Sequence, residues 1–101
     1  MTATLEHEVF SRYLNTPFRI SVDEANTIEA ELSEVSELHL SPRQERFELV
    51  FRGPRQPLIN QGSYRFEHDE MGDFILFIVP VRQDDDGTFY EACFNRTRKD
   101  D

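Results

Sequence analysis

The sequence holds little that would cross-link a fold or anchor it in a membrane. Its 101 residues include one cysteine, Cys93, so an intrachain disulfide is excluded, and no Cys/His pairs stand at zinc-binding spacing. No apolar run approaches the roughly 20 residues of a membrane span, and the opening MTATLEHEVFSRYL lacks the apolar core of a signal peptide. We therefore expect a cytoplasmic protein with no membrane association.

Basic residues are also scarce. The chain has 11 Lys and Arg against 20 Asp and Glu, which gives a net charge of −9. Binding to phosphates requires a concentrated basic surface, so nucleic acid is not an expected partner. Arginines are interleaved among the acids, and only Asp84-Asp85-Asp86 forms an acidic run. We interpret the charge as a solubility feature and not as mimicry of nucleic acid.

The N-terminal segment has the spacing of a helix. Its apolar residues fall on one stripe and predict a short helix over about 4–14, which Asn15 and Pro17 end. From Phe18 onward, apolar and polar residues alternate instead. This period of two predicts strands at about 18–22, 27–35, 46–52, 63–68, 73–81 and 88–95.

One segment allows two interpretations. In residues 23–39, the side chains of Ile28, Leu32, Val35 and His39 also fit one face of a helix. Alternation on both sides of the DEAN turn favours two strands, and the skip from Leu32 to Val35 is then a β-bulge. The whole chain, 1–101, therefore predicts a single mainly β domain: a small antiparallel β-barrel or a two-layer sandwich of about six strands, with one short N-terminal helix.

The stretch EHDEMGD, 67–73, places one histidine and four carboxylates close together. In a strand, Glu67 and His68 point to opposite faces, and the residues that follow form a hairpin turn at whose end Gly72 is free to take a positive φ. The pattern also lacks the spacing of an oxygen-ligand calcium loop. We interpret it as a polar turn with a partly buried structural His68, and we expect no metal and no cofactor.

Few other residues of the sequence are candidates for catalysis or ligand binding. No serine stands in a nucleophile motif, and Cys93 lies within an apolar strand, so we expect no catalytic residues and no enzymatic activity. Arg52 and Arg55 flank Gly53-Pro54 and, with His68, are candidates for binding an anion or another small ligand. An enzyme of unknown class is the remaining alternative.

One strand indicates an interaction surface. Residues 74–79, FILFIV, are apolar at every position, so both faces of this strand require cover. The N-terminal helix is one candidate for that cover, and a protein partner or a second copy of the chain is the other. The candidate surface comprises Ile75, Phe77 and, on the last strand, Phe89.

The second half of the chain resembles a family of small uncharacterised bacterial proteins of similar length, known as a domain of unknown function. The resemblance is carried by FELVFRGP (47–54), QGSYRFEH (61–68), MGDFILFIVPV (71–81) and YEACFNR (90–96). It implies a single-domain β protein. Genes of this family are expected beside those of phage-tail-collar-like proteins, which implies an accessory or assembly role. We therefore expect a non-enzymatic protein-interaction module, and the resemblance implies that it serves such a system as an accessory or assembly factor.

Overall fold

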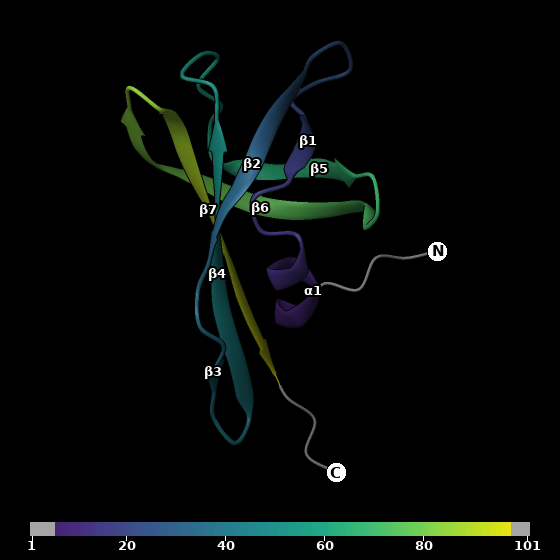
Figure 1. Cartoon of the computed structure of the whole chain (residues 1–101), viewed down its shortest axis with the longest axis vertical. Helices are drawn as coiled ribbons and strands as arrows, with labels where there is room; N and C mark the ends of the chain where they lie inside the picture. Colours follow the sequence, from purple (N-terminus) through teal and green to yellow (C-terminus); the bar gives the residue numbers. More distant parts are fainter. Residues whose placement is uncertain (1–5, 98–101) are drawn as a thin grey trace.

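The computed structural model describes residues 6–97, and this part of the chain contains one helix and seven strands (Figure 1). The elements in chain order are α1 (His7–Arg12), β1 (Pro17–Ser21), β2 (Thr27–Val35), β3 (His39–Leu40), β4 (Gln44–Gly53), β5 (Gly62–His68), β6 (Gly72–Asp84) and β7 (Gly87–Thr97).

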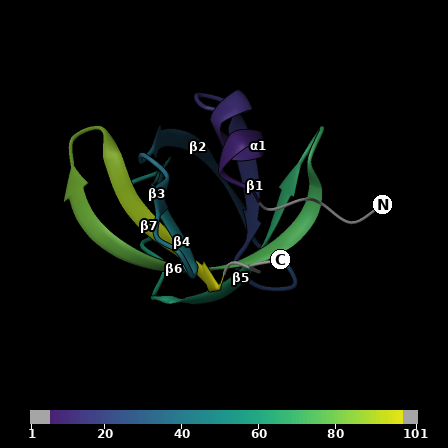
Figure 2. The ribbon, with the colours of Figure 1, turned by 90° about the horizontal axis from the view of Figure 1, so that it is seen from below.

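The strands form a closed antiparallel barrel. Their order is β2-β1-β5-β6-β7-β4-β3, and an additional pairing between β2 and β4 joins six of the strands into a ring. The short strand β3 pairs with β4 outside that ring. Figure 2 shows the strands curving around a common axis, with α1 across the end nearest the viewer. Of the two predicted architectures, the barrel is confirmed.

The two long strands β6 and β7 each pair with different neighbouring strands along their length. The first half of β6 pairs with β5 up to Gly62↔Ile78, and its second half pairs with β7 from Val79↔Glu91 onward. Beyond this point, β7 continues on β4 as far as Gln44↔Thr97. The lower parts of β4 and β7 therefore project below the barrel together with β3 (Figure 1). Between β7 and the first half of β6 the strands separate.

The barrel interior is filled by side chains, because alternate residues along much of β1, β2, β4, β5 and the first half of β6 are buried. Rings from three different strands touch there: the ring centroids lie 5.3 Å apart for Phe18 and Phe51 and 5.0 Å apart for Phe51 and Phe66. At one end, Phe10 of α1 is fully buried against the rings of Phe47, Phe74 and Phe94.

The loop between β4 and β5 provides a second internal contact. Ile59 in this irregular, proline-containing segment is 4% exposed, and its backbone N–H donates to the Tyr90 hydroxyl at 3.0 Å. Thr88, which is fully buried, and Gln83 both donate to the carbonyl of Arg55. These bonds hold the loop against the start of β7.

The ambiguous segment is a strand over residues 27–35, and a register shift between Leu32 and Glu34 provides the expected bulge. The helix alternative is therefore wrong for these residues. The strand β3 was not predicted. It has only two residues, both of them exposed, so it lacks the alternating burial that produces a sequence signal.

The helix is shorter than predicted. It covers residues 7–12 of the expected 4–14, and residues 4 and 5 lie outside the described part of the chain. Asn15 ends the turn that follows, with a φ of 67°, and its N–H bonds to the carbonyl of Leu32 at 2.7 Å. Asparagine tolerates this left-handed conformation better than most residues do. The chain thereby leaves the helix and enters β1 at Pro17.

Candidate functional site

The polar stretch at 67–73 forms the hairpin between β5 and β6. Asp69, Glu70 and Met71 make the reversal, and Gly72 has a φ of 83° with open space around it. The turn that the sequence predicts is therefore confirmed, and so is the positive φ expected at this glycine.

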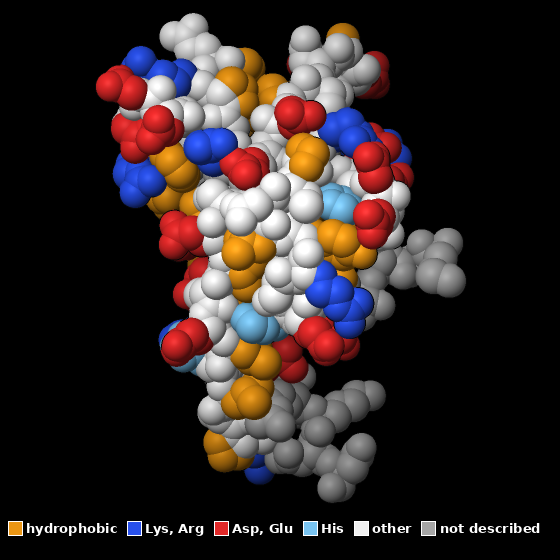
Figure 3. Space-filling view, viewed as in Figure 1, with side chains coloured by type: hydrophobic (Ala, Val, Ile, Leu, Met, Phe, Trp, Pro, Cys, Tyr) orange, Lys and Arg blue, Asp and Glu red, His pale blue; other side chains and the backbone are white. Residues whose placement is uncertain are grey.

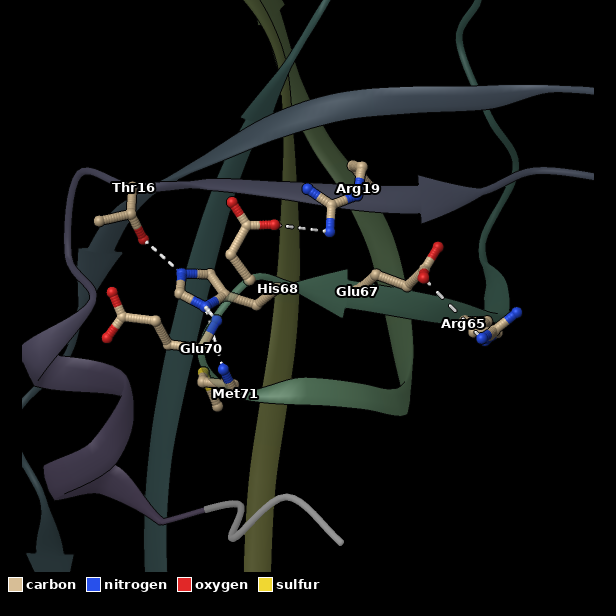
Figure 4. A network of polar contacts seen from close by, with 8 residues as sticks. Thr16, Arg19, Arg65, Glu67, His68, Glu70 and Met71 are labelled. Atoms are coloured by element: carbon tan, nitrogen blue, oxygen red, sulfur yellow. Dashed lines mark hydrogen bonds and ion pairs between the residues drawn. The ribbon is translucent and has the colours of Figure 1, made fainter. Parts of the chain in front are cut away.

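The carboxylates of this hairpin diverge. They contact three different partners: Asp69 contacts Arg19, Glu70 contacts Tyr13, and Glu67 and Asp73 share Arg65. Figure 4 shows the Arg65 pair on one side of the hairpin and the Glu70 side chain on the other. Within residues 6–97, no three His, Cys, Asp or Glu side chains gather at a point where a metal ion would be held.

His68 lies between this turn and the segment that links α1 to β1. Its Nδ1 accepts the backbone N–H of Glu70 at 3.1 Å and that of Met71 at 3.2 Å (Figure 4). A nitrogen that accepts carries no proton, so the proton of the neutral ring is on Nε2. Nε2 lies 3.0 Å from the Thr16 hydroxyl oxygen and donates to it. The contacts therefore select a single tautomer.

The environment keeps this imidazole neutral. The side chain is only 7% exposed, and burial is the main cause that lowers the pKa of His68 below its ordinary value of 6.5. The carboxylates of Glu70 and Asp69 act in the opposite direction, and Arg19 lowers the pKa further. Because both ring nitrogens are engaged in hydrogen bonds, His68 is not free to act as a general base.

Sequence reasoning placed His68 at the end of the strand before the turn but did not find its partner. Thr16 is 52 positions away, and its hydroxyl donates in turn to the carbonyl of Tyr13 at 2.6 Å. The side chain of Tyr13 also reaches the hairpin, where its hydroxyl donates to Glu70 at 3.2 Å. The local sequence signals only that Asn15 and Pro17 end a helix, and it contains no sign of which strand end will lie beside Thr16.

The two arginines expected to accompany His68 have other contacts. Arg52 pairs with Glu31 at 2.5 Å across β2 and β4, in an open groove that Glu29 and Asp86 also line. The backbone carbonyl of Arg55 holds the loop described above. Neither arginine makes a hydrogen bond or an ion pair with His68. The acidic lining of the Arg52 groove is unfavourable for an anion.

Of the three residues predicted to form an interaction surface, two are exposed and one is buried. Ile75 is 66% exposed and Phe77 is 54% exposed, while the alternate residues Leu76 and Ile78 are buried. Phe89 does not share this exposure. It is 7% exposed, because the guanidinium of Arg82 on the paired strand lies 4.0 Å from its ring centroid.

The helix does not cover this outer face. Its buried residue, Phe10, contacts Phe74, which belongs to the inner face of β6, with ring centroids 5.8 Å apart. Of the two candidates for cover that the sequence raised, α1 is therefore wrong.

Cys93 is on the outer face of β7. Its thiol donates to Glu91 at 3.6 Å, and burial together with the Glu91 carboxylate raises the pKa of Cys93. A raised pKa disfavours the thiolate, which is the nucleophilic form.

Charges of both signs are intermixed on one face of the molecule (Figure 3). On the face seen in Figure 3, acidic and basic side chains are intermixed, and small hydrophobic patches separate them. The arrangement agrees with the interleaved charges of the sequence. Within residues 6–97, no helix has the length and hydropathy needed to cross a lipid bilayer.

The described part of the chain, residues 6–97, is thus a small closed β-barrel with a short helix before its first strand. Residues 5–94 match the model of the family described as domain of unknown function DUF6916, and the chain belongs to that family. No curated protein and no solved structure matched the chain.

Proposed function

We propose that the chain is a non-enzymatic protein-interaction module that binds a partner through the outer face of β6, around Ile75 and Phe77. The exposure of these two large apolar side chains on a regular strand is the observation that carries the proposal. Apolar and aromatic side chains at the centre of a contact, with a polar rim, are typical of protein interfaces.

The surroundings of the two residues support a preformed contact surface. Ile75 lies opposite Arg65 and Phe77 lies opposite Ser63 on β5, so both are held by regular strand pairing. Arg65 is itself paired with Asp73, which supplies a polar rim. A side chain on a paired strand has little backbone freedom to lose on binding, and this favours affinity.

As the binding partner at this face, a different protein is favoured over a second copy of the chain. Two copies each carrying a net charge of −9 repel when identical faces meet. The specific partner that we propose is a tail-collar-like protein, for which this chain acts as an accessory or assembly factor. The family resemblance supports this identity, and a dimer of the chain is the alternative outcome of the test.

The test is purification of the tagged chain from its native organism, followed by mass spectrometry, with wild type and the double variant I75S/F77S. Loss of both side chains weakens an interface centred on them by about 3 kcal/mol, or about a hundredfold in Kd. The control is L40S, since Leu40 on β3 is similarly exposed, at 57%, away from β6. Because all three residues are exposed, each variant keeps its free energy of unfolding within about 0.5 kcal/mol.

Stoichiometric recovery of a tail-collar-like protein with wild type and L40S, and its loss with I75S/F77S, is the expected result. Recovery of a different specific protein with the same pattern retains the interaction proposal and removes the tail-collar identity. Recovery of the chain without a partner, or equal recovery of the partner with I75S/F77S, contradicts the proposal. Light scattering of the purified chain separates a dimer from these outcomes.

A further inference from the structure

The geometry points to His68 as an acid-sensitive latch that holds α1 across the end of the barrel and releases it when the imidazole is protonated. The latch has two sides. On one side Nδ1 accepts the two backbone N–H groups of the hairpin, and on the other Nε2 donates to Thr16, next to the helix.

Protonation affects the two sides differently. In the imidazolium both nitrogens carry a proton and neither accepts. The N–H groups of Glu70 and Met71 then face a third N–H group, so both hydrogen bonds are lost. The bond from Nε2 to Thr16 does not require the neutral ring and is kept. The imidazole must therefore move away from the turn, toward water, to be charged.

Movement of the imidazole affects the helix through a short chain of contacts. The Thr16 hydroxyl donates to the carbonyl of Tyr13, the residue directly after α1. The ring centroids of Tyr13 and His68 are 4.6 Å apart, and the Tyr13 hydroxyl donates to Glu70 of the hairpin. The hairpin and the end of the helix are thus joined by the imidazole of His68 and also by the contact between Tyr13 and Glu70.

Few other contacts hold the helix. It has six residues, and Glu6 at its start makes no capping bond through its side chain. A helix of this length is not stable alone in water. The other anchors include the buried ring of Phe10 and Val9, which packs against the core. His7 adds a ring contact with Phe47, with centroids 5.2 Å apart, and a bond of 2.7 Å between its Nε2 and the carbonyl of Ser36. A carbonyl can only accept, so Nε2 of His7 is the donor in this bond.

The charged and titratable groups around His68 come from three elements. Glu70 and Asp69 of the hairpin favour the imidazolium, and Arg19 of β1 disfavours it. Tyr13 is the titratable group next to it from the helix side, and its pKa is raised, so it is uncharged in the same range. The attraction of the two carboxylates is smaller than the effect of burial, and the neutral form is favoured when the latch is closed.

The direction of the pH dependence follows from this balance. The pKa of His68 in the closed state is below the ordinary 6.5, so the opened state takes up a proton first as the pH falls. The contribution of the latch is complete above about 6.5 and is lost progressively below it, until the pKa of the closed state has been passed. For each unit by which the closed state lowers the pKa of His68, the equilibrium ratio of closed to open molecules falls tenfold between high and low pH.

The experiment is hydrogen exchange by NMR on the full chain between about pH 7.5 and about pH 5, the range in which histidine titrates. The probes are the helical amides of Phe10 and Tyr13, which donate to Glu6 and Phe10. Their protection factors, each taken relative to the intrinsic rate at the same pH, are expected to fall as the pH is lowered. The pKa of His68 is measured by titration in the same sample. For each pH unit by which this pKa lies below 6.5, the protection factors are expected to fall about tenfold.

Two variants make the test specific. In His68→Asn, the amide oxygen can accept the same two N–H groups as an Asx turn, as Asp23 does here for Ala25 and Asn26. This side chain does not titrate, so protection of the helical amides is expected to be independent of pH. The matched control is His39→Asn, since His39 is exposed on β3, and it is expected to respond as wild type does.

Protection that does not change with pH in wild type overturns the latch. So does a pH response of His68→Asn as large as that of wild type, or nitrogen chemical shifts that place the neutral proton of His68 on Nδ1. Should His68→Asn fail to fold, the wild-type comparison of the protection factors with the pKa of His68 decides the question alone.

Discussion

A single methyl group at Gly87 is expected to be far more damaging than the same group at Gly72. Both glycines have a positive φ, 143° at Gly87 and 83° at Gly72, so alanine is strained at either position. The surroundings differ. A Cβ at Gly72 meets nothing within 4 Å, whereas a Cβ at Gly87 overlaps the carbonyl oxygen of Gly53 on the adjacent strand β4. That atom is part of a paired backbone and cannot rotate away.

The expected losses follow from these two differences. Alanine at Gly72 carries the cost of a left-handed conformation, about 1–2 kcal/mol. Alanine at Gly87 carries backbone strain of about 1–3 kcal/mol, and displacement of a packed neighbour adds about 1–3 kcal/mol. We therefore expect Gly87→Ala to lower the free energy of unfolding by about 2–6 kcal/mol, which is a large part of the stability of a small domain.

Urea unfolding followed by circular dichroism, with both variants in the same buffer, measures the difference. The m-value of each variant is compared with that of wild type, because a changed m-value indicates a change in the unfolded or native ensemble. Equal losses for Gly87→Ala and Gly72→Ala would refute the argument, since the contact with Gly53 would then contribute nothing.

Two further substitutions test how the barrel interior is held. Phe10→Ala is expected to cost about 3–5 kcal/mol, as for other buried phenylalanines, and a thermal midpoint close to that of wild type would contradict the burial of Phe10 beneath α1. Tyr90→Phe removes the acceptor of the buried Ile59 N–H and is expected to cost about 1–3 kcal/mol. Faster hydrogen exchange at the Ile59 amide, together with the loss in urea unfolding, checks this second expectation.

The strands were predictable because one side of each faces the interior and the other faces water. β2 is an example: the alternation of Ile28, Ala30 and Leu32 favoured a strand over a helix, and the skip from Leu32 to Val35 predicted its bulge. Closure of the barrel was not predictable in the same way. It depends on the pairings of β1 with β5 and of β2 with β4, which join segments distant in the chain and have no local signature.

The candidate surface was likewise only partly predictable from the sequence. Ile75, Phe77 and Phe89 are equally apolar in the sequence, yet only the first two are exposed. The difference arises because Arg82 lies opposite Phe89 and its guanidinium covers the ring. That pairing depends on a register shift between residues 80 and 82 of β6, and a pattern of apolar residues does not contain it.

The packing of the barrel limits where recognition can occur. Phe18, Phe51 and Phe66 occupy its interior without exposure, so a ligand would enter only if side chains moved. The outer face around Ile75 and Phe77 requires no such movement. The rings of Phe47 and Phe74 are buried beneath α1 and become more accessible when the helix leaves. Binding at the outer face therefore has no reason to depend on the protonation of His68, whereas exposure of the rings beneath α1 does.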